Sequence, residues 1–339
     1  MLSNYNPEVI IEPNILELEL DKLKDQKIVL LTTKTPYKLF NSYLKNLEPK
    51  ILIISKDIAE INKISSSKEI INSDIIVGFG SGTVLDVSKV ISSKTQKKLI
   101  AIPTVLSCNV FATNKSTIIE EGKIKTIDSK VPDKVIIDTK IIKLSDVRYT
   151  LAGMADVLSI ITAIFDWRLA RKNGKEKYNY FIAEVGKALV THIKQNYKKI
   201  FDKNDKAIEE LAQMLLFSGY ITNLYGCGRP ESGSEHMFAR AIEESNIYQK
   251  KLLHGESVIL GILLSLELQG QNNVDFIYDI AKRMGIKKIF DDLSITEEDV
   301  ICYLLKASQI RRERFTIFNL VNLGYKEAKV IVKKVLSKI

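Results

Sequence analysis

Short apolar runs rich in β-branched residues alternate with helix-like segments along residues 1–145. Bare apolar runs of this kind are typical of parallel strands that are buried on both faces of a sheet. The alternation therefore predicts a doubly wound, Rossmann-like α/β domain. The expected strands are residues 27–31, 51–54, 75–77, 99–102 and 135–137, with helices expected at 36–47, 57–64 and 84–92.

The pattern changes near residue 149, where apolar residues begin to recur with the 3.6-residue period of helices. We expect an all-α second domain, and we place the two domains at residues 1–150 and 151–339. The helices expected there are 154–171, 178–196, 206–224, 235–243, 254–269, 274–284, 297–308 and 325–336.

Composition narrows the functional class only slightly. The net charge is +9, but the lysines are spread along the chain and form no arginine-rich or aromatic-interleaved patch, so nucleic-acid binding is not favoured. The charge still favours anionic substrates. The chain has three cysteines in no C-x-x-C pair, no signal peptide pattern and no apolar run long enough for a membrane span. We expect a cytoplasmic protein that makes no disulfides.

A glycine-rich turn, G-F-G-S-G at residues 78–82, joins the strand expected at 75–77 to the following helix. Such a turn lets a diphosphate approach the backbone amides at a helix N-terminus. It is not the G-x-G-x-x-G signature, and a simple tight turn is the alternative interpretation. Thr104 and Ser107 follow the next strand, at the edge where open α/β sheets bind ligands.

Asp156, His236 and His254 form a candidate metal-ligand set in the second half of the chain. A catalytic metal site uses a few protein ligands and keeps one position open for water or substrate. The alternatives are that Asp156 caps a helix and that each histidine is an ordinary hydrogen-bonded residue. Arg240 is expected on the same helical face as His236.

Five motifs occur in order along the chain: GSGTVLDVSK at 80–89, PT-x-x-S at 103–107, G-x-x-D-x5-TA-x-x-DW at 153–167, RP-x-SGSEH at 229–236 and LHGE at 253–256. This ordered set resembles a superfamily that comprises glycerol dehydrogenases, iron-containing alcohol dehydrogenases and dehydroquinate synthases. The chain is most similar to the sn-glycerol-1-phosphate dehydrogenase family, and the resemblance covers roughly residues 5 to 335.

The resemblance implies a dehydroquinate synthase-like fold, with the active site between a Rossmann-like domain and an all-α domain. It implies NAD or NADP as cofactor and one divalent metal, Zn²⁺ or Fe²⁺, held by the catalytic residues Asp156, His236 and His254. The cofactor-binding residues that it implies are Gly80, Ser81, Gly82, Thr83, Asp86, Thr104 and Ser107. It also implies a small phosphorylated substrate and a role in phospholipid synthesis, and we expect a homo-oligomer.

The reaction implied by the resemblance is the reduction of dihydroxyacetone phosphate to sn-glycerol 1-phosphate. Arg229, Lys115 and Ser232 are candidates for a phosphate clamp, since arginine binds phosphate in a bidentate manner. Asn109 is a further substrate candidate, because it follows Cys108 where relatives commonly carry an aspartate. Residues 32–34 (T-T-K) stand where an acidic residue would bind an NAD ribose, and they tolerate the 2′-phosphate of NADP.

Other functions remain open from the sequence. The loss of the aspartate at Asn109 also fits a dehydrogenase of unphosphorylated alcohols or polyols. A dehydroquinate synthase-like lyase would use NAD only transiently, but its ligand set usually has Glu where Asp156 stands. A non-catalytic binding protein is disfavoured by the complete Asp/His/His set.

Overall fold

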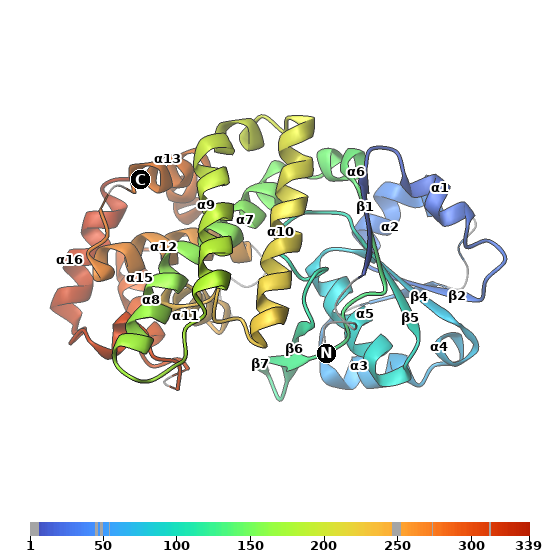
Figure 1. Cartoon of the computed structure of the whole chain (residues 1–339), viewed down its shortest axis with the longest axis horizontal. Coiled ribbons are helices and arrows are strands. Elements are labelled where there is room, and N and C mark those ends of the chain that lie inside the picture. Colours follow the sequence, from blue (N-terminus) through green and yellow to red (C-terminus); the bar gives the residue numbers. More distant parts are fainter. Residues whose placement is uncertain are drawn as a thin grey trace. The chain divides into compact units, whose positions relative to one another are not determined.

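The computed structural model describes residues 7–44, 47, 50–53, 55–245, 252–272, 274–311 and 313–339. The chain divides into two compact units (Figure 1). The first contains residues 1–150 and 202–223, and the second contains residues 151–201 and 224–339. The first break falls after Thr150, and residues 202–223 return to the first unit.

A parallel sheet forms the centre of the first unit, with strand order β1-β8-β5-β4-β2-β3 (Figure 1). Every pairing in this sheet is parallel. The strands are β1 (Glu8–Glu12), β2 (Ile28–Thr32), β3 (Lys50–Leu52), β4 (Ile75–Gly80), β5 (Lys98–Pro103) and β8 (Lys134–Asp138). The helices of this unit are α1 (Leu16–Asp21), α2 (Lys34–Phe40), α3 (Ile58–Ser65), α4 (Lys68–Asn72), α5 (Gly82–Thr95), α6 (Thr139–Leu144) and α10 (Asp205–Tyr225), with a 3₁₀ turn at Asn41–Leu44.

Helices cover both faces of the sheet, and successive side chains of each strand point to opposite faces. In β2, Leu30 packs with α1 and α2 in one core cluster, whereas Val29 and Leu31 pack with α3, α4 and α5 in the other. This arrangement confirms the doubly wound α/β fold predicted for this part of the chain. The expected strand at 51–54 is β3, and Ile54 lies outside the described residues.

The order in which the parallel strands are added to the sheet reverses between β2 and β4. From β2 the chain adds β3 on one side, then returns to place β4 on the other side of β2. In open α/β sheets, ligands bind beyond the carboxyl ends of the strands at such a point. Here those ends are Thr32 and the glycine turn that follows β4.

An antiparallel hairpin that the sequence analysis did not anticipate lies between β5 and β8. Its strands are β6 (Lys115–Glu120) and β7 (Lys123–Asp128). The connecting residues, Glu121 and Gly122, both have positive φ, as the tight turns of β-hairpins require.

Helix α10 packs within the first unit, although its sequence follows helices of the second. The Nδ2 group of Asn109 donates to Ser218 Oγ at 2.8 Å, and Asn223 Nδ2 donates to the carbonyl of Ala112 at 2.9 Å. Gly219 lies so close to Ala112 that a Cβ at this glycine would be 2.5 Å from the alanine Cβ. Helical periodicity predicts the helix but carries no information on which unit it joins.

The second unit is built from helices, as predicted. The elements are α7 (Val147–Leu158), α8 (Ile160–Lys172), α9 (Tyr180–Phe201), α11 (Ser234–Glu243), α12 (His254–Gln269), α13 (Asp275–Arg283), α14 (Ile286–Asp292), α15 (Glu297–Ala307) and α16 (Tyr325–Leu336), with a 3₁₀ turn at Ile317–Asn319. Helix α12 is buried on nearly every side, which makes it the central helix of this unit.

The segment Val147–Lys172 is apolar and long enough to cross a membrane by length and composition alone. Its most apolar stretch is 72% buried inside the protein, as in the core helix of a soluble protein. The sequence predicted one helix at 154–171, but the structure has α7 and α8, which meet at Ser159. The Ser159 hydroxyl contacts the carbonyl oxygens of Asp156 and Glu231.

Candidate metal centre and cofactor turn

Asp156, His236 and His254 meet in the second unit. Asp156 comes from the last turns of α7, His236 from the first turn of α11, and His254 is the first residue of α12. One ligand atom from each residue lies within 4.8 Å of the corresponding atoms of the other two. The structure thus brings together side chains that are separated by up to 98 residues of sequence.

The Nε2 atoms of both histidines point towards the carboxylate of Asp156. Asp156 Oδ1 lies 3.5 Å from His236 Nε2 and 3.7 Å from His254 Nε2. The two imidazole ring centres are 5.3 Å apart. The ligand atoms of a tetrahedral zinc ion lie about 3.3–3.5 Å apart, so these atoms need little movement to share one ion. Two imidazole nitrogens and a carboxylate oxygen are a donor set that suits Zn²⁺ or Fe²⁺.

Each histidine is oriented by a second carboxylate on its other ring nitrogen. His236 Nδ1 lies 2.9 Å from Glu235 Oε1, and His254 Nδ1 lies 2.6 Å from Glu243 Oε1. Metal-binding histidines commonly make this contact, because it fixes the tautomer that directs Nε2 towards the metal. The paired carboxylates are a further observation that fits a cation at this place.

The electrostatic field of the site also favours a cation. Burial lowers the pKa of His236, but its hydrogen bonds to Asp156 and Glu235 outweigh burial and raise the pKa to about 10. The side chains remain accessible to solvent and ligand, with exposed fractions of 18% for His236 and 39% for His254.

Two close helix contacts hold α12, and with it His254, in place. A Cβ on Gly255 would lie 2.3 Å from the Cα and carbonyl oxygen of Ala152 in α7. A Cβ on Gly261 would lie 2.5 Å from the carbonyl oxygen of Glu235 in α11. Glycine at these positions therefore lets α12 pack directly on the two helices that carry the other candidate ligands.

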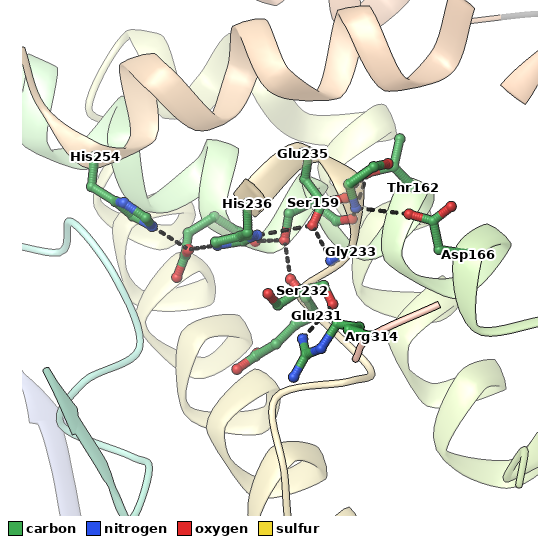
Figure 2. Close-up of polar contacts among 12 residues, drawn as sticks. Ser159, Thr162, Asp166, Glu231, Ser232, Gly233, Glu235, His236, His254 and Arg314 are labelled. Atoms are coloured by element: carbon green, nitrogen blue, oxygen red, sulfur yellow. Dashed lines mark hydrogen bonds and ion pairs between the residues drawn. The ribbon is translucent and has the colours of Figure 1, made fainter. Parts of the chain in front are cut away.

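Buried polar contacts fix the start of α11 (Figure 2). The backbone amide of Ser234 donates to Asp166 Oδ2 at 2.7 Å, so a carboxylate from α8 caps this helix. Glu235 accepts hydrogen bonds from the Thr162 hydroxyl at 2.7 Å and the Gly233 amide at 2.6 Å. Burial, followed by the nearby Glu235 charge, raises the pKa of Asp166 to about 6. These contacts set the position of His236.

The predicted cofactor turn lies at the carboxyl end of β4 in the first unit. Gly80 ends β4, Ser81 precedes α5, and Gly82 and Thr83 begin that helix. Thr104 donates its backbone amide to the carbonyl of Gly80 at 3.1 Å, which joins this turn to the end of β5. The amides of the first turn of α5 and the helix dipole provide what a diphosphate needs.

The surroundings of Gly82 fit a bound dinucleotide. A Cβ at this position would meet Cys108 Sγ at 3.4 Å and Val110 at 3.7 Å, which are ordinary contacts. Packing within the chain therefore does not require glycine here, whereas close approach of a diphosphate would. Asp86 is buried beside Lys56 and Lys89, at 3.5 and 3.9 Å. Ser107 is half-buried in the loop that follows β5.

The structure does not support Arg229 as a phosphate clamp. Its side chain is only 1% exposed, and its Nη2 donates to the carbonyls of Asp166 and Phe315 at 3.0 and 2.6 Å. Its Nε lies 2.7 Å from Glu176 Oε2. These contacts tie the loop before α11 to α8 and to the chain near residue 315, so Arg229 has an internal structural role.

The other substrate candidates are divided between the units. Ser232 lies just before α11, close in sequence to His236, and its carbonyl accepts a hydrogen bond from Arg314. Lys115 and Asn109 belong to the first unit, where Lys115 forms an ion pair with Asp128 and Asn109 donates to Ser218.

The residues that the sequence analysis missed are Glu235 and Glu243 as orienting carboxylates. Glu243 lies seven residues after His236, a helical spacing that could have indicated it.

The fold and site define a class of protein: an α/β unit with a dinucleotide-type turn, and a helical unit with an Asp/His/His cluster. The family described as iron-containing alcohol dehydrogenase matches residues 16–145. A probable glycerol dehydrogenase from Sinorhizobium meliloti has a similar fold, with a TM-score of 0.78 at 16% identity over 98% of this chain and 97% of that chain.

Sequence relatives identify the family more closely. A glycerol-1-phosphate dehydrogenase of Saccharolobus islandicus is 32% identical over 312 residues, covering 90% of this chain and 88% of the relative. A glycerol-1-phosphate dehydrogenase of Methanosarcina acetivorans is 29% identical over 267 residues, covering 79% and 74% of the two chains. The chain belongs to the glycerol-1-phosphate dehydrogenase family, which confirms the resemblance found in the sequence.

Proposed function

We propose that this protein is a metal-dependent NAD(P)H oxidoreductase that reduces dihydroxyacetone phosphate to sn-glycerol 1-phosphate. The observation that carries the proposal is the convergence of Asp156, His236 and His254 in a chain of the glycerol-1-phosphate dehydrogenase family. In the overall reaction, the ketone carbon gains a hydride from the reduced nicotinamide and the oxygen gains a proton from solvent. The product is the secondary alcohol, and NAD(P)⁺ is released.

The chain's own residues would hold and orient the reacting groups. Asp156, His236 and His254 would bind one divalent metal, with Zn²⁺ favoured over Fe²⁺ by the donor set. When bound, the metal supplies a Lewis acid that polarises the ketone carbonyl and stabilises the charge developing on its oxygen. Glu235 and Glu243 would keep both Nε2 atoms directed at it.

The first unit would bind the cofactor. The amides at Gly80, Ser81, Gly82 and Thr83 would hold the diphosphate, with Asp86, Thr104 and Ser107 lining the rest of the site. Lys34 is exposed at the start of α2, directly after the end of β2. A lysine there accepts the 2′-phosphate of NADP, so the proposal includes both NAD and NADP as cofactors.

The test is a substrate panel with NADH and NADPH, before and after removal of the metal with a chelator. We expect loss of reduced-nicotinamide absorbance with dihydroxyacetone phosphate, weak activity with unphosphorylated dihydroxyacetone, and recovery of chelated protein on adding Zn²⁺. Release of inorganic phosphate without net cofactor turnover would instead identify a lyase. Equal activity on phosphorylated and unphosphorylated substrates would identify a polyol dehydrogenase.

The setting of the enzyme is part of the same proposal. We propose a cytoplasmic homo-oligomer that supplies glycerol phosphate for phospholipid synthesis. Cys108, Cys227 and Cys302 form no disulfide in the structure. Mass measurement of the native protein in solution tests the oligomeric part.

A further inference from the structure

Lys89 of α5 is a fully buried charged residue on the helix that begins at the cofactor turn, and the function proposed above does not use it. Its side chain is 0% exposed, whereas lysines are almost never fully buried unless they are paired. Gly82, Asp86 and Lys89 are spaced by four and three residues, so they lie along one face of α5. The face that begins at the cofactor turn therefore also carries a buried ion pair.

This face of α5 contacts residues 108–115, which run from the loop after β5 into β6 and which we name the wall segment (Figure 1). At the start of the helix, a Cβ at Gly82 would lie 3.4 Å from Cys108 Sγ and 3.7 Å from Val110 Cγ1. The wall segment therefore lies directly against the glycine that we expect beside the diphosphate. A displacement of this segment would change the space that a dinucleotide can occupy.

The ammonium group of Lys89 holds the other end of the wall segment. Its Nζ donates to the carbonyls of Thr113 and Lys115 at 3.0 and 2.5 Å, and it lies 3.9 Å from Asp86 Oδ1. An ammonium group has three donors, and three acceptor groups surround this one. Burial of a charge is unfavourable, and an apolar side chain of similar size would fill the same space. A lysine at this position is therefore explained by the groups that it fixes rather than by packing.

Asn223 of α10 holds the same segment from a second helix. It is 6% exposed, and its side chain uses both of its polar atoms on the wall segment. The Nδ2 group donates to the carbonyl of Ala112, and Oδ1 accepts from the amide of Asn114, each at 2.9 Å. Each residue from 112 to 115 thus has a backbone group that is bound by either Asn223 or Lys89, in alternation.

We propose that Lys89 and Asn223 are positioning residues for the dinucleotide: they hold the wall segment against the cofactor turn, so that NAD(P)H meets a preformed site. The inference rests on the proposed function, because it takes the turn at residues 80–83 as the place where the diphosphate binds. A binding loop that is already ordered loses little conformational freedom when the ligand binds, and this raises the affinity.

A purely structural role for both residues is the competing explanation. In that case their contacts stabilise the first unit, and their loss lowers the unfolding free energy without changing how the folded protein binds the cofactor. A positioning role predicts instead that the folded protein itself binds NAD(P)H more weakly. Cofactor affinity, measured on the folded fraction of each variant, therefore separates the two explanations.

The direct test is fluorescence titration of the metal-loaded protein with NADH and NADPH. We expect the Kd of the bound cofactor to rise about ten- to hundred-fold in Lys89→Met and in Asn223→Ala. Lys203→Met is the matched control, because Lys203 also donates to two backbone carbonyls of the first unit, those of Lys143 and Ser145 at the end of α6. Wild-type Kd values in both Lys89→Met and Asn223→Ala would overturn the proposal.

The reactivity of Cys108 gives a readout of the wall segment itself. In Lys89→Met, this half-buried thiol should react about tenfold faster with a thiol reagent, because a loosened segment opens more readily. Cys227 and Cys302 belong to the second unit and serve as internal controls, whose rates should match those of the wild type in peptide mass spectrometry. An unchanged rate at Cys108 would mean that Lys89 does not hold the segment.

The outcome stays decisive if a variant or the proposed reaction fails. If Lys89→Met does not fold, Asn223→Ala decides by the same two measurements, because it acts on the same segment and leaves the buried lysine paired. If the wild type binds a reduced cofactor but does not reduce dihydroxyacetone phosphate, the proposed function fails, and the titrations still decide the roles of both residues. If the wild type binds neither NADH nor NADPH, the positioning role is overturned as well.

Discussion

Gly255 of α12 packs against the backbone of Ala152 in α7, with room for no side chain between them. A Cβ at Gly255 would lie 2.3 Å from two Ala152 backbone atoms. Ala152 precedes Asp156 by one helical turn, and Gly255 follows His254 directly. This contact therefore sets the separation between a carboxylate and an imidazole of the metal cluster.

Replacing Gly255 with alanine should disturb the metal centre. The added methyl group must push α12 away from α7, at a cost of about 1–3 kcal/mol in folding free energy. We expect a lower melting temperature and weaker metal binding by the folded fraction. Gly228→Ala is the control, because its nearest neighbour would be Ser232 Cβ at 4.0 Å. Wild-type metal affinity in Gly255→Ala would show that this packing does not set the site.

Glu243→Gln should weaken metal binding without disrupting the fold. The substitution keeps the size of the side chain but removes the charge that contacts His254 Nδ1 at 2.6 Å. Loss of such an orienting carboxylate typically costs about 10–100-fold in metal affinity or activity. Titration with Zn²⁺ against a competing chelator measures the effect. Glu298→Gln, an acid on α15 that pairs with Tyr325, should bind metal like the wild type.

Gly82→Ala should separate cofactor binding from stability. The new methyl group would make ordinary contacts with Cys108 and Val110, so the unfolding free energy should change little. It would occupy space that a diphosphate needs, so NAD(P)H affinity should fall at least about tenfold, the equivalent of 1.4 kcal/mol. Fluorescence titration with NADH and NADPH measures this. Unaltered binding of both cofactors would place the diphosphate elsewhere.

Lys89 should make stability depend on pH in the alkaline range. It is fully buried, and its Nζ donates to the carbonyls of Thr113 and Lys115 at 3.0 and 2.5 Å. Burial lowers its pKa from 10.5 to about 8, against the opposing charge of Asp86. Between these two values the unfolded chain binds more protons than the folded chain, so the contribution of Lys89 to stability rises with pH.

The Lys89→Met variant lacks this contribution. The unfolding free energy of the wild type minus that of the variant should increase by up to about 3 kcal/mol from pH 8 to pH 10.5, at 1.36 kcal/mol per pKa unit. Denaturant unfolding at several pH values measures it, and the subtraction removes the effects of other titrating groups. A difference that is constant with pH would mean that Lys89 keeps its ordinary pKa in the fold.

The fold was predictable where periodicity is strong and local. The strands from β2 to β8 that form the buried sheet were expected as apolar runs, and α16 has the bounds that its pattern predicted. The break between α7 and α8 was not predictable, because Ser159 interrupts no apolar period and no proline or glycine follows it. The edge strand β1 was missed because its pairing with β8 joins residues far apart in sequence.

The site was predictable only in part, for a related reason. Asp156, His236 and His254 lie in recognisable motifs, and the structure brings them together. Contacts made only by helix packing leave no local trace, and the hydrogen bond from the Ser234 amide to Asp166 is one of them. The substrate contact of Arg229 stays a prediction from its motif neighbours, and the folded chain buries its guanidinium against Glu176, a contact that the sequence did not indicate.

The central claim is that one divalent metal is shared by Asp156, His236 and His254, and metal analysis of purified variants tests it most directly. The wild type and His192→Ala, which removes a histidine of α9 outside the cluster, should each retain close to one metal ion per chain. His236→Ala and His254→Ala should lose it together with NAD(P)H-dependent activity, while remaining folded by circular dichroism. Full metal content in either of these two variants would contradict the account.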